Sequence, residues 1–310
     1  MITHIKVQDY RIALVGTGAL GSQLALVLHQ LGFSIDCLIN RTLDDALELS
    51  RKIKTKVISD QVEDIPKAIN LLLIAVQDSK IPEVVKQYAE HNHNLKHLTV
   101  VHFSGALTTD VLLPLGRRGA LTLSMHPYQT FTKKILPNYP EKFKCYYGLQ
   151  SDEEEGIEFG KFLAHQFGGK ILILPKEAKT LYHISSVMLS NYMVTLTSVA
   201  SELFAALGTP QREAFKVFEP IMRSMLDNLR DSERIWDALS GPIERGDVAT
   251  VKRHLAELSE QMPHLISVYA AMAMETVRVA VQKGSISQDE AGIMLDDLEN
   301  YLRRESEFEE

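Results

Sequence analysis

RIALVGTGALG, residues 11–21, decides the fold of this chain. Residues 11–15 are typical of a buried strand, and a G-x-G-x-x-G turn follows directly, formed by Gly16, Thr17, Gly18, Ala19, Leu20 and Gly21. Residues 22–31 have helical apolar spacing, Gly32 suits the end of a helix, and residues 33–39 read as a second strand. This order predicts a β-α-β unit.

The three glycines of this turn each have a physical role. Gly16 permits the tight turn, Gly18 lets the backbone approach a diphosphate, and Gly21 lets the helix pack on the strand. The helix N-terminus presents free amide hydrogens and a partial positive charge. We therefore expect residues 16–21 to bind the diphosphate of a dinucleotide; the alternative is a glycine-rich turn without a ligand.

The end of the second strand, Asn40-Arg41-Thr42, indicates which dinucleotide binds. NAD sites usually place a carboxylate there for the ribose 2′-hydroxyl, and none is present. Arg41 suits a 2′-phosphate, and Asn40 and Thr42 can donate hydrogen bonds to it. The sequence therefore predicts NADP rather than NAD, although Thr42 with Asp45 also resembles a helix capping box.

The rest of the chain divides into two parts. Up to residue 175, apolar runs alternate with helical patterns, and the runs are residues 11–16, 34–40, 70–76, 97–103, 120–126, 144–150 and 170–175. The last two are closer in type to strands added at a sheet edge. From residue 177 on, helical spacing replaces the strands. We predict an α/β Rossmann-type doubly wound, mostly parallel sheet over residues 1–176, followed by an all-α domain over residues 177–310.

The composition of the 310 residues limits the classes of protein. Hydrophobic residues make up 45% and charged residues 24%, which excludes disorder and coiled coils, and a net charge of −7 argues against nucleic-acid binding. Cys37 and Cys145 are too few for a disulfide framework or a structural zinc site. No signal-peptide or membrane-span pattern is visible. We expect a cytoplasmic protein with no membrane or nucleic-acid partner, ending in a solvated acidic tail (EFEE).

Polar residues follow three of the predicted strands, at the edge where open α/β sheets bind ligands. After the strand at 70–76, the backbone of Val76 and Gln77 is expected beside the nicotinamide, whereas Asp78 and Ser79 are better explained as the N-cap of the helix containing Pro82. His102 is expected to be packed within its strand.

Ser104 and His126 lie at the ends of the next two strands. Ser104 is a candidate contact to the reacting group, with a simple turn residue as the alternative. His126 is better placed, because Pro127 fixes the chain after it. Its alternative is a hydrogen-bonded histidine at a strand end.

A polar face on the first long helix of the second part is expected to form another wall of the substrate pocket; the alternative is a helix face that is only partly solvated. His183, Ser186, Val187 and Ser190 share one face, with Asn191 at its edge. Reduction of C=O or C=N needs a proton donor, and histidine titrates near neutral pH. His183 is the first candidate for this acid and His126 the second. We predict no metal site, since no Cys/His pairing, HExxH motif or acidic cluster occurs.

These motifs resemble a bacterial family that joins a Rossmann-like domain to a helical domain called DUF2520, along nearly the whole chain. The matching segments are GTGALG, NRT, HFSGAL (102–107), SMHPYQTF (124–131), YHISSVMLSNYMVTL (182–196) and LSGPIERGDVATVKRHL (239–255). The wider superfamily includes pyrroline-5-carboxylate reductase, ketopantoate reductase, prephenate dehydrogenase, and the 6-phosphogluconate and β-hydroxyacid dehydrogenases. The resemblance implies an NADP-dependent oxidoreductase, in some members an alternative ketopantoate reductase, that forms homodimers through the helical domain.

One departure concerns the proton donor. In the ketopantoate reductases and hydroxyacid dehydrogenases a lysine precedes the asparagine of this helix by four residues, whereas Val187 stands four residues before Asn191 here. The donor must then come from elsewhere, and His183 lies one turn earlier. Ser240 and Arg245 match the helical-domain loop, and the resemblance implies that they hold a substrate carboxylate; a loop with a solvated arginine is the alternative.

Three functions follow from these observations. The first is NADPH-dependent reduction of a small anionic 2-oxo acid, with ketopantoate the best single candidate. The second is reduction of a cyclic imine, as in pyrroline-5-carboxylate reductase. The third is a non-catalytic NADP-binding sensor, which the missing lysine keeps open.

Overall fold

The chain forms two compact units, residues 1–192 and residues 193–310. The computed structural model describes residues 6–306, with the side chains of 304–306 left out, and the expected acidic tail lies outside these residues. The division between the units falls inside helix α6 (Lys179–Ala206), so the first part of this helix belongs to the sheet unit. The strands nevertheless end at Ile173, close to the end of the α/β part that the sequence predicts.

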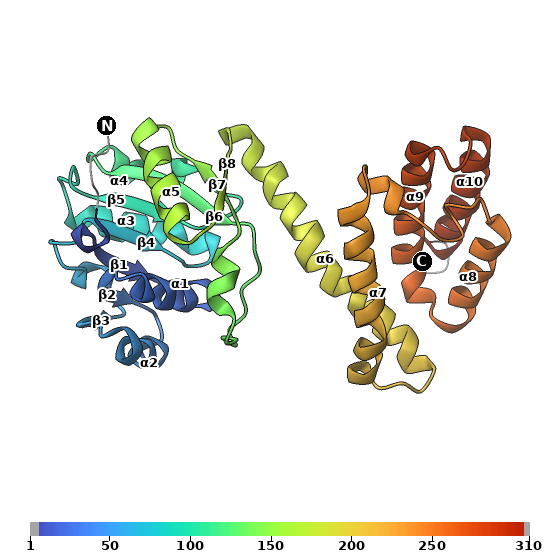
Figure 1. The fold of residues 1–310 in the computed structure, drawn as a ribbon, viewed down its shortest axis with the longest axis horizontal. Coiled ribbons are helices and arrows are strands. Elements are labelled where there is room, and N and C mark those ends of the chain that lie inside the picture. Colours follow the sequence, from blue (N-terminus) through green and yellow to red (C-terminus); the bar gives the residue numbers. More distant parts are fainter. Residues whose placement is uncertain (1–5, 307–310) are drawn as a thin grey trace. The chain divides into compact units, whose positions relative to one another are not determined.

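The first unit contains an eight-stranded sheet with the order β3-β2-β1-β4-β5-β6-β7-β8 (Figure 1). All neighbouring strands are parallel except β6 and β7, which are antiparallel, while β8 is parallel to β7. The order reverses between β1 and β4, the switch point at which doubly wound sheets bind ligands. The strands are β1 Arg11–Val15, β2 Ser34–Ile39, β3 Val57–Ser59, β4 Leu71–Ile74, β5 Thr99–His102, β6 Leu121–Pro127, β7 Tyr146–Gln150 and β8 Lys170–Ile173.

The predicted doubly wound sheet is confirmed, including the position of its last two strands at one edge. Strand β3 was missing from the prediction. It has only three residues, all half-buried, and its pairing with β2 rather than an apolar run makes it a strand.

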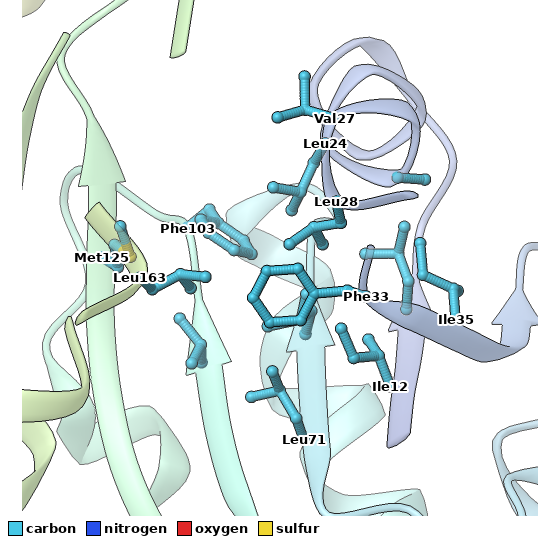
Figure 2. Close-up of a cluster of buried hydrophobic side chains, with 14 of the residues drawn as sticks. Ile12, Leu24, Val27, Leu28, Phe33, Ile35, Leu71, Phe103, Met125 and Leu163 are labelled. Atoms are coloured by element: carbon cyan, nitrogen blue, oxygen red, sulfur yellow. The ribbon is translucent and has the colours of Figure 1, made fainter. Parts of the chain in front are cut away.

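Helices cover both faces of the sheet. One core lies between the sheet and helices α1 (Ala19–Gln30), α2 (Leu43–Ile53) and α5 (Glu154–Gln166). Figure 2 shows part of it, with Leu24, Val27 and Leu28 of α1 lying over Phe33 and the strands. The second core lies on the other face, against α3 (Ile81–His91) and α4 (Leu113–Gly116). Strands buried on both faces explain why the apolar runs are nearly continuous.

The second unit is helical, as predicted from the apolar spacing. Its core consists of side chains from α8 (Val248–Gln261), α9 (Ile266–Lys283) and α10 (Gln288–Ser306), including Leu255, Ala270 and Leu298, which are fully buried. In helix α7 (Gln211–Asp231), the side chains of Ala214 and Phe218 are buried. The sheet unit and the helical unit therefore each have a core of their own.

One stretch of the described residues, Pro263–Lys283, is long and apolar enough to cross a membrane, with a mean hydropathy of 1.2. Core helices of soluble proteins have the same properties. Ile266, Ala273 and Val277 of this stretch are buried in the core of the helical unit, whereas Val268 and Met272 are exposed.

Candidate functional site

The glycine-rich turn between β1 and α1 has the geometry that its three glycines predict. Gly16 has a φ of +96°, and a Cβ there would lie 2.6 Å from the Ala75 carbonyl oxygen. A Cβ on Gly21 would collide with the Gly16 carbonyl oxygen. At Gly18, by contrast, no atom lies within 4 Å of an added Cβ. Gly16 and Gly21 are therefore needed by the fold, whereas Gly18 keeps space open above the helix.

This open space faces groups that lack partners among the described residues. The first amides of α1, from Ala19 to Gly21, have no acceptors within their own helix. The Oγ1 of Thr17 is buried and makes no hydrogen bond among the described residues. Thr17, Gly18 and Ser22 also line a cavity of about 330 Å³. An unpaired hydroxyl beside free amides suits the oxygen atoms of a diphosphate, so this turn fits the cofactor that the sequence predicts.

The three residues after β2, Asn40, Arg41 and Thr42, differ in the contacts that their side chains make. Asn40 accepts a hydrogen bond from the Thr17 amide (3.0 Å) and donates one to the Thr42 carbonyl oxygen (2.7 Å), so its side chain holds the glycine turn. Thr42 occupies the N-cap position of α2, but its side chain does not cap the helix. The capping box suggested by Thr42 and Asp45 is therefore absent. Arg41 is exposed, and its guanidinium makes no ion pair with any described residue.

The end of β4 lies against the glycine turn. Val76 Cγ1 would be 2.9 Å from a Cβ on Gly16, and Gln77 follows in an exposed position. The predicted N-cap role of Asp78 and Ser79 is wrong, because α3 begins at Ile81 and no side chain caps it. Asp78 instead accepts a hydrogen bond from the Ser104 hydroxyl at 2.7 Å. Asp78 therefore bonds to Ser104, which follows another strand, instead of capping the adjacent helix.

Ser104 and His102 organise the loop after β5. The Ser104 Oγ accepts hydrogen bonds from the amides of Ala106 (3.2 Å) and Leu107 (2.9 Å) while it donates to Asp78. His102 is fully buried, as expected for a packed histidine. Its Nδ1 accepts from the Ser104 amide, so its Nε2 carries the proton that is donated to the Thr108 carbonyl oxygen. Ser104 therefore has every hydrogen-bonding position of its hydroxyl in use.

His126 lies on β6 and contacts the first turns of α6. Its Nδ1 is 3.0 Å from the hydroxyl of Tyr182, which also lies 3.3 Å from the His126 carbonyl oxygen. Tyr182 packs over β7 at Gly148, where a Cβ would be 2.7 Å from the tyrosine ring. Burial, and then the positive charge of Lys179, lower the pKa of His126 to about 3. His126 is therefore neutral near pH 7.

His183 meets His126 at the backbone of Gly105. A Cβ on Gly105 would collide with His183 Nδ1 and would lie 3.0 Å from His126 Nε2. The two rings are edge to face, with centroids 5.9 Å apart. The loop after β5, strand β6 and helix α6 thus bring two imidazole nitrogens to one place.

These histidines line a cavity of about 500 Å³ within the sheet unit. Other lining residues include Tyr128, Gln129, Thr130, Ser186, Ser190 and Asn191. Ser186 donates to the His183 carbonyl oxygen (2.8 Å) and Ser190 to Asn191 Oδ1 (2.8 Å). The predicted polar face of α6 is therefore brought together with His126, whereas Ser104 does not line this cavity.

Lys179 is a residue that sequence reasoning missed. It is the first residue of α6 and only 1% exposed, and its Nζ donates to the Ser104 carbonyl oxygen (3.0 Å) and the Ser124 hydroxyl (2.8 Å). Burial lowers its pKa to about 8, although Asp78 opposes this shift. The available signal was its spacing of four residues before His183, which places both on one helical face.

Ser240 and Arg245 lie in the helical unit, around the turn between η7 (Ile235–Ala238) and α8. Both are exposed, and their predicted role toward a carboxylate stays a prediction. The neighbouring Glu244 fixes this turn instead, through a 2.8 Å ion pair with Lys283 of α9. No group of three or more potential metal-ligating side chains occurs within residues 6–306.

The doubly wound sheet, its glycine-rich turn and the separate helical unit define a two-domain protein of the dinucleotide-binding Rossmann class. Family comparisons identify a Rossmann-like domain over residues 2–127 and the domain of unknown function DUF2520 over residues 145–276. The chain therefore contains a Rossmann-like domain followed by a DUF2520 domain, which confirms the resemblance inferred from its motifs. The second match starts at β7, so it includes the last strands of the sheet as well as helices.

Solved structures share this fold over most of the chain. A candidate NADP oxidoreductase from Bacteroides fragilis is 22% identical, with a TM-score of 0.74 over 88% of this chain and 100% of its own. Protein TM1727 from Thermotoga maritima is 24% identical, with a TM-score of 0.67 over 88% and 99%. A Plasmodium falciparum pyrroline carboxylate reductase with NADP bound is 13% identical, with a TM-score of 0.57 over 90% and 98%. No curated protein matches the chain.

Proposed function

We propose that this protein is an NADPH-dependent oxidoreductase that reduces a small anionic 2-oxo acid, with ketopantoate as the first candidate substrate. The observation that carries the proposal is that one edge of the sheet bears two features. These are the open turn at Gly18, beside free amides, and the meeting of His126 and His183 at Gly105. A reductase of this fold needs a cofactor site and a proton donor on the same edge.

The residues that would hold the cofactor lie along the first half of the sheet. The amides of residues 19–21 and the Thr17 hydroxyl would bind the diphosphate, and Arg41 would bind the 2′-phosphate. The backbone of Val76 and Gln77 would lie beside the nicotinamide. Bound NADPH supplies a hydride. The fold shared with oxidoreductases that are described as binding NADP supports this choice of cofactor.

His183 is our candidate for the residue that protonates the substrate oxygen. Protonation of His126 is strongly disfavoured near neutral pH, so His126 is suited to hydrogen bonding rather than to supplying a proton from a cationic ring. Asn191, Ser186 and Ser190 line the same cavity and would orient the substrate. Among the lining residues none is Asp or Glu, which suits an anionic substrate. That Ser240 and Arg245 hold a carboxylate stays a prediction of the family resemblance.

A cyclic imine is the second candidate substrate, because the fold is shared with a pyrroline carboxylate reductase. The same cavity and the same histidine would serve, since reduction of C=N also needs a proton at the nitrogen. Substrate assays separate the two candidates.

The test measures cofactor binding first and turnover second. Calorimetry should detect tighter binding of NADPH than of NADH, and Arg41→Asp should shift this preference toward NADH. NADPH consumption is then followed with ketopantoate, with pyrroline-5-carboxylate and with other 2-oxo acids. Tight binding without turnover of any of them would favour a sensor, and an absence of binding would overturn the proposal.

The roles of the histidines are tested in the same assay. His183→Ala should lower kcat by about 100-fold, the usual contribution of a general acid, with NADPH affinity retained. His97→Ala, on an exposed loop residue, is the matched control. Wild-type kcat in His183→Ala would remove this residue from the mechanism.

We also propose that the protein is a cytoplasmic homodimer. Both cysteines, Cys37 and Cys145, are free, which suits a reducing compartment. Ala214 and Phe218 of helix α7 are buried, whereas Val217, Ile221 and Met225, which share the same apolar face by their helical spacing, are exposed in the single chain. A second copy covering this face would agree with the dimers that the family resemblance implies.

A further inference from the structure

Lys179 carries a buried positive charge at the end of the sheet where ligands bind. Its ammonium group is held by a carbonyl oxygen after β5 and a hydroxyl on β6, and it forms no ion pair within residues 6–306. Such a charge is weakly screened, because little water surrounds it. Its field therefore extends to whatever binds at the neighbouring strand ends.

The charged and titratable groups around Lys179 come from four elements. Asp78 follows β4 and is linked to Lys179 through Ser104, and its negative charge opposes that of the lysine. Burial, and then the positive charge of Lys179, lower the pKa of His102 on β5 and of His126 on β6 to about 3 each. On α6, burial raises the pKa of Tyr182, and His183 lies one turn after Lys179. Lys179 and Asp78 are therefore the two opposing charges beside the neutral His102 and His126.

The two redox forms of a nicotinamide differ by one charge on the ring. The oxidised ring is a cation, and the reduced ring is neutral. In a doubly wound sheet the dinucleotide lies across the switch point, with one nucleotide on each half of the sheet. Gly18 and Arg41 lie on the β1–β3 half of the sheet, so the adenosine end of the dinucleotide is expected there. The nicotinamide is then expected on the β4–β6 half, where Lys179 and Asp78 lie.

We propose that Lys179 makes the site discriminate between the redox forms of its cofactor, binding NADPH in preference to NADP⁺ through repulsion of the cationic ring. This rests on the proposed function, because it requires that the site bind these nucleotides. The functional consequence is that the oxidised cofactor leaves readily after each turnover. Asp78 acts in the opposite direction, so the net preference is the difference between two charges.

The experiment compares the dissociation constants of NADP⁺ and NADPH for the full-length protein by calorimetry. The ratio of NADP⁺ to NADPH constants should fall by about tenfold in Lys179→Met, the size of one charge–charge interaction in a partly buried site. Asp78→Asn should raise this ratio. Lys176→Met is the matched control, because Lys176 is paired with Asp110 and Asp152 on the surface, and it should leave the ratio unchanged.

The wild-type protein provides a second readout that does not depend on a variant's folding. Lys179 loses its proton as the pH rises through about 8, so the wild-type ratio should fall between about pH 7 and about pH 9.5. In Lys179→Met the ratio should be independent of pH over this range.

The possible failures of the two proposals differ. If neither nucleotide binds, the proposed function is wrong. If both bind, but the ratio is the same in Lys179→Met and wild type, or does not change with pH in wild type, then Lys179 does not discriminate and this inference is wrong. A general structural effect of the substitution would weaken both nucleotides alike and leave the ratio unchanged.

Discussion

Gly105 lies where two imidazole rings approach the backbone of the loop after β5. Its two neighbours are held in place, because Ser104 is bonded to Asp78 and Lys179, and the Ala106 amide is bonded to the Ser104 hydroxyl. The loop therefore cannot move easily to admit a side chain. The positions of His126 and His183 in the cavity that they line therefore depend on the absence of a Cβ at Gly105.

We expect Gly105→Ala to lower kcat by at least about tenfold without a matching loss of NADPH affinity. The added methyl would collide with His183 Nδ1, and small misplacements of catalytic groups are costly. Steady-state kinetics and calorimetry measure the two effects. Gly292→Ala is the control, because no atom lies within 4 Å of its added Cβ. Unchanged kcat in Gly105→Ala would show that this contact does not position His183.

At the scale of elements, two glycines of the β1–α1 turn are needed by the fold, whereas Gly18 borders the space in which the cofactor is proposed to bind. Gly21→Ala should destabilise the protein by about 2 to 3 kcal/mol, because its Cβ would overlap the Gly16 carbonyl oxygen. Gly18→Ala should change stability by less than about 1 kcal/mol, since its Cβ enters open space at an ordinary backbone conformation.

Urea unfolding and calorimetry with NADPH distinguish the two variants. Gly18→Ala should lose NADPH affinity by at least about tenfold while it remains as stable as wild type, because its methyl group occupies the approach of the diphosphate. Wild-type affinity in this variant would show that no ligand approaches the turn at this point.

Elements whose signals are local were predictable from the sequence. The glycine turn, the apolar strands and the polar face of α6 are each encoded within a few consecutive residues or one helical period. Asp78 was misassigned because its partner, Ser104, is on another strand end. Lys179 was missed because its burial depends on β5 and β6, and a lysine in a first helical turn is ordinarily solvated. Contacts between strand ends are thus what the sequence alone does not reveal.

At the scale of the whole molecule, the buried histidines make stability depend on pH. Burial lowers the pKa of His102 from its ordinary value of 6.5 to about 3. Between these values the unfolded chain binds a proton that the folded chain does not, so stability is complete above about pH 6.5 and is lost as the pH falls.

We therefore expect the free energy of unfolding to fall between about pH 7 and about pH 5. His102 contributes up to about 1.4 kcal/mol per pH unit below its unfolded pKa. Urea unfolding across this range measures the slope. His102→Asn should reduce the slope by about one proton, whatever its effect on stability at pH 7. An equal slope in the variant would contradict the assignment.

The apolar face of α7 predicts an effect on assembly. Ile221 is 69% exposed in the single chain, so Ile221→Lys should convert the proposed dimer to a monomer. Light scattering measures the mass. Gln211→Lys adds the same charge to an exposed polar position of this helix and should leave the dimer intact. A dimeric Ile221→Lys would place the interface elsewhere.

Gly148 carries a constraint that no nucleotide-binding motif would reveal. It lies opposite His126 in the antiparallel pairing of β6 and β7, and the ring of Tyr182 rests on it. A larger residue there would displace the Tyr182 ring, and the tyrosine hydroxyl would then no longer be held beside His126 Nδ1. A larger residue at this buried strand position would therefore press on Leu174 as well as on Tyr182, and would reach the proposed proton-transfer site through His126 without itself lying in the cavity.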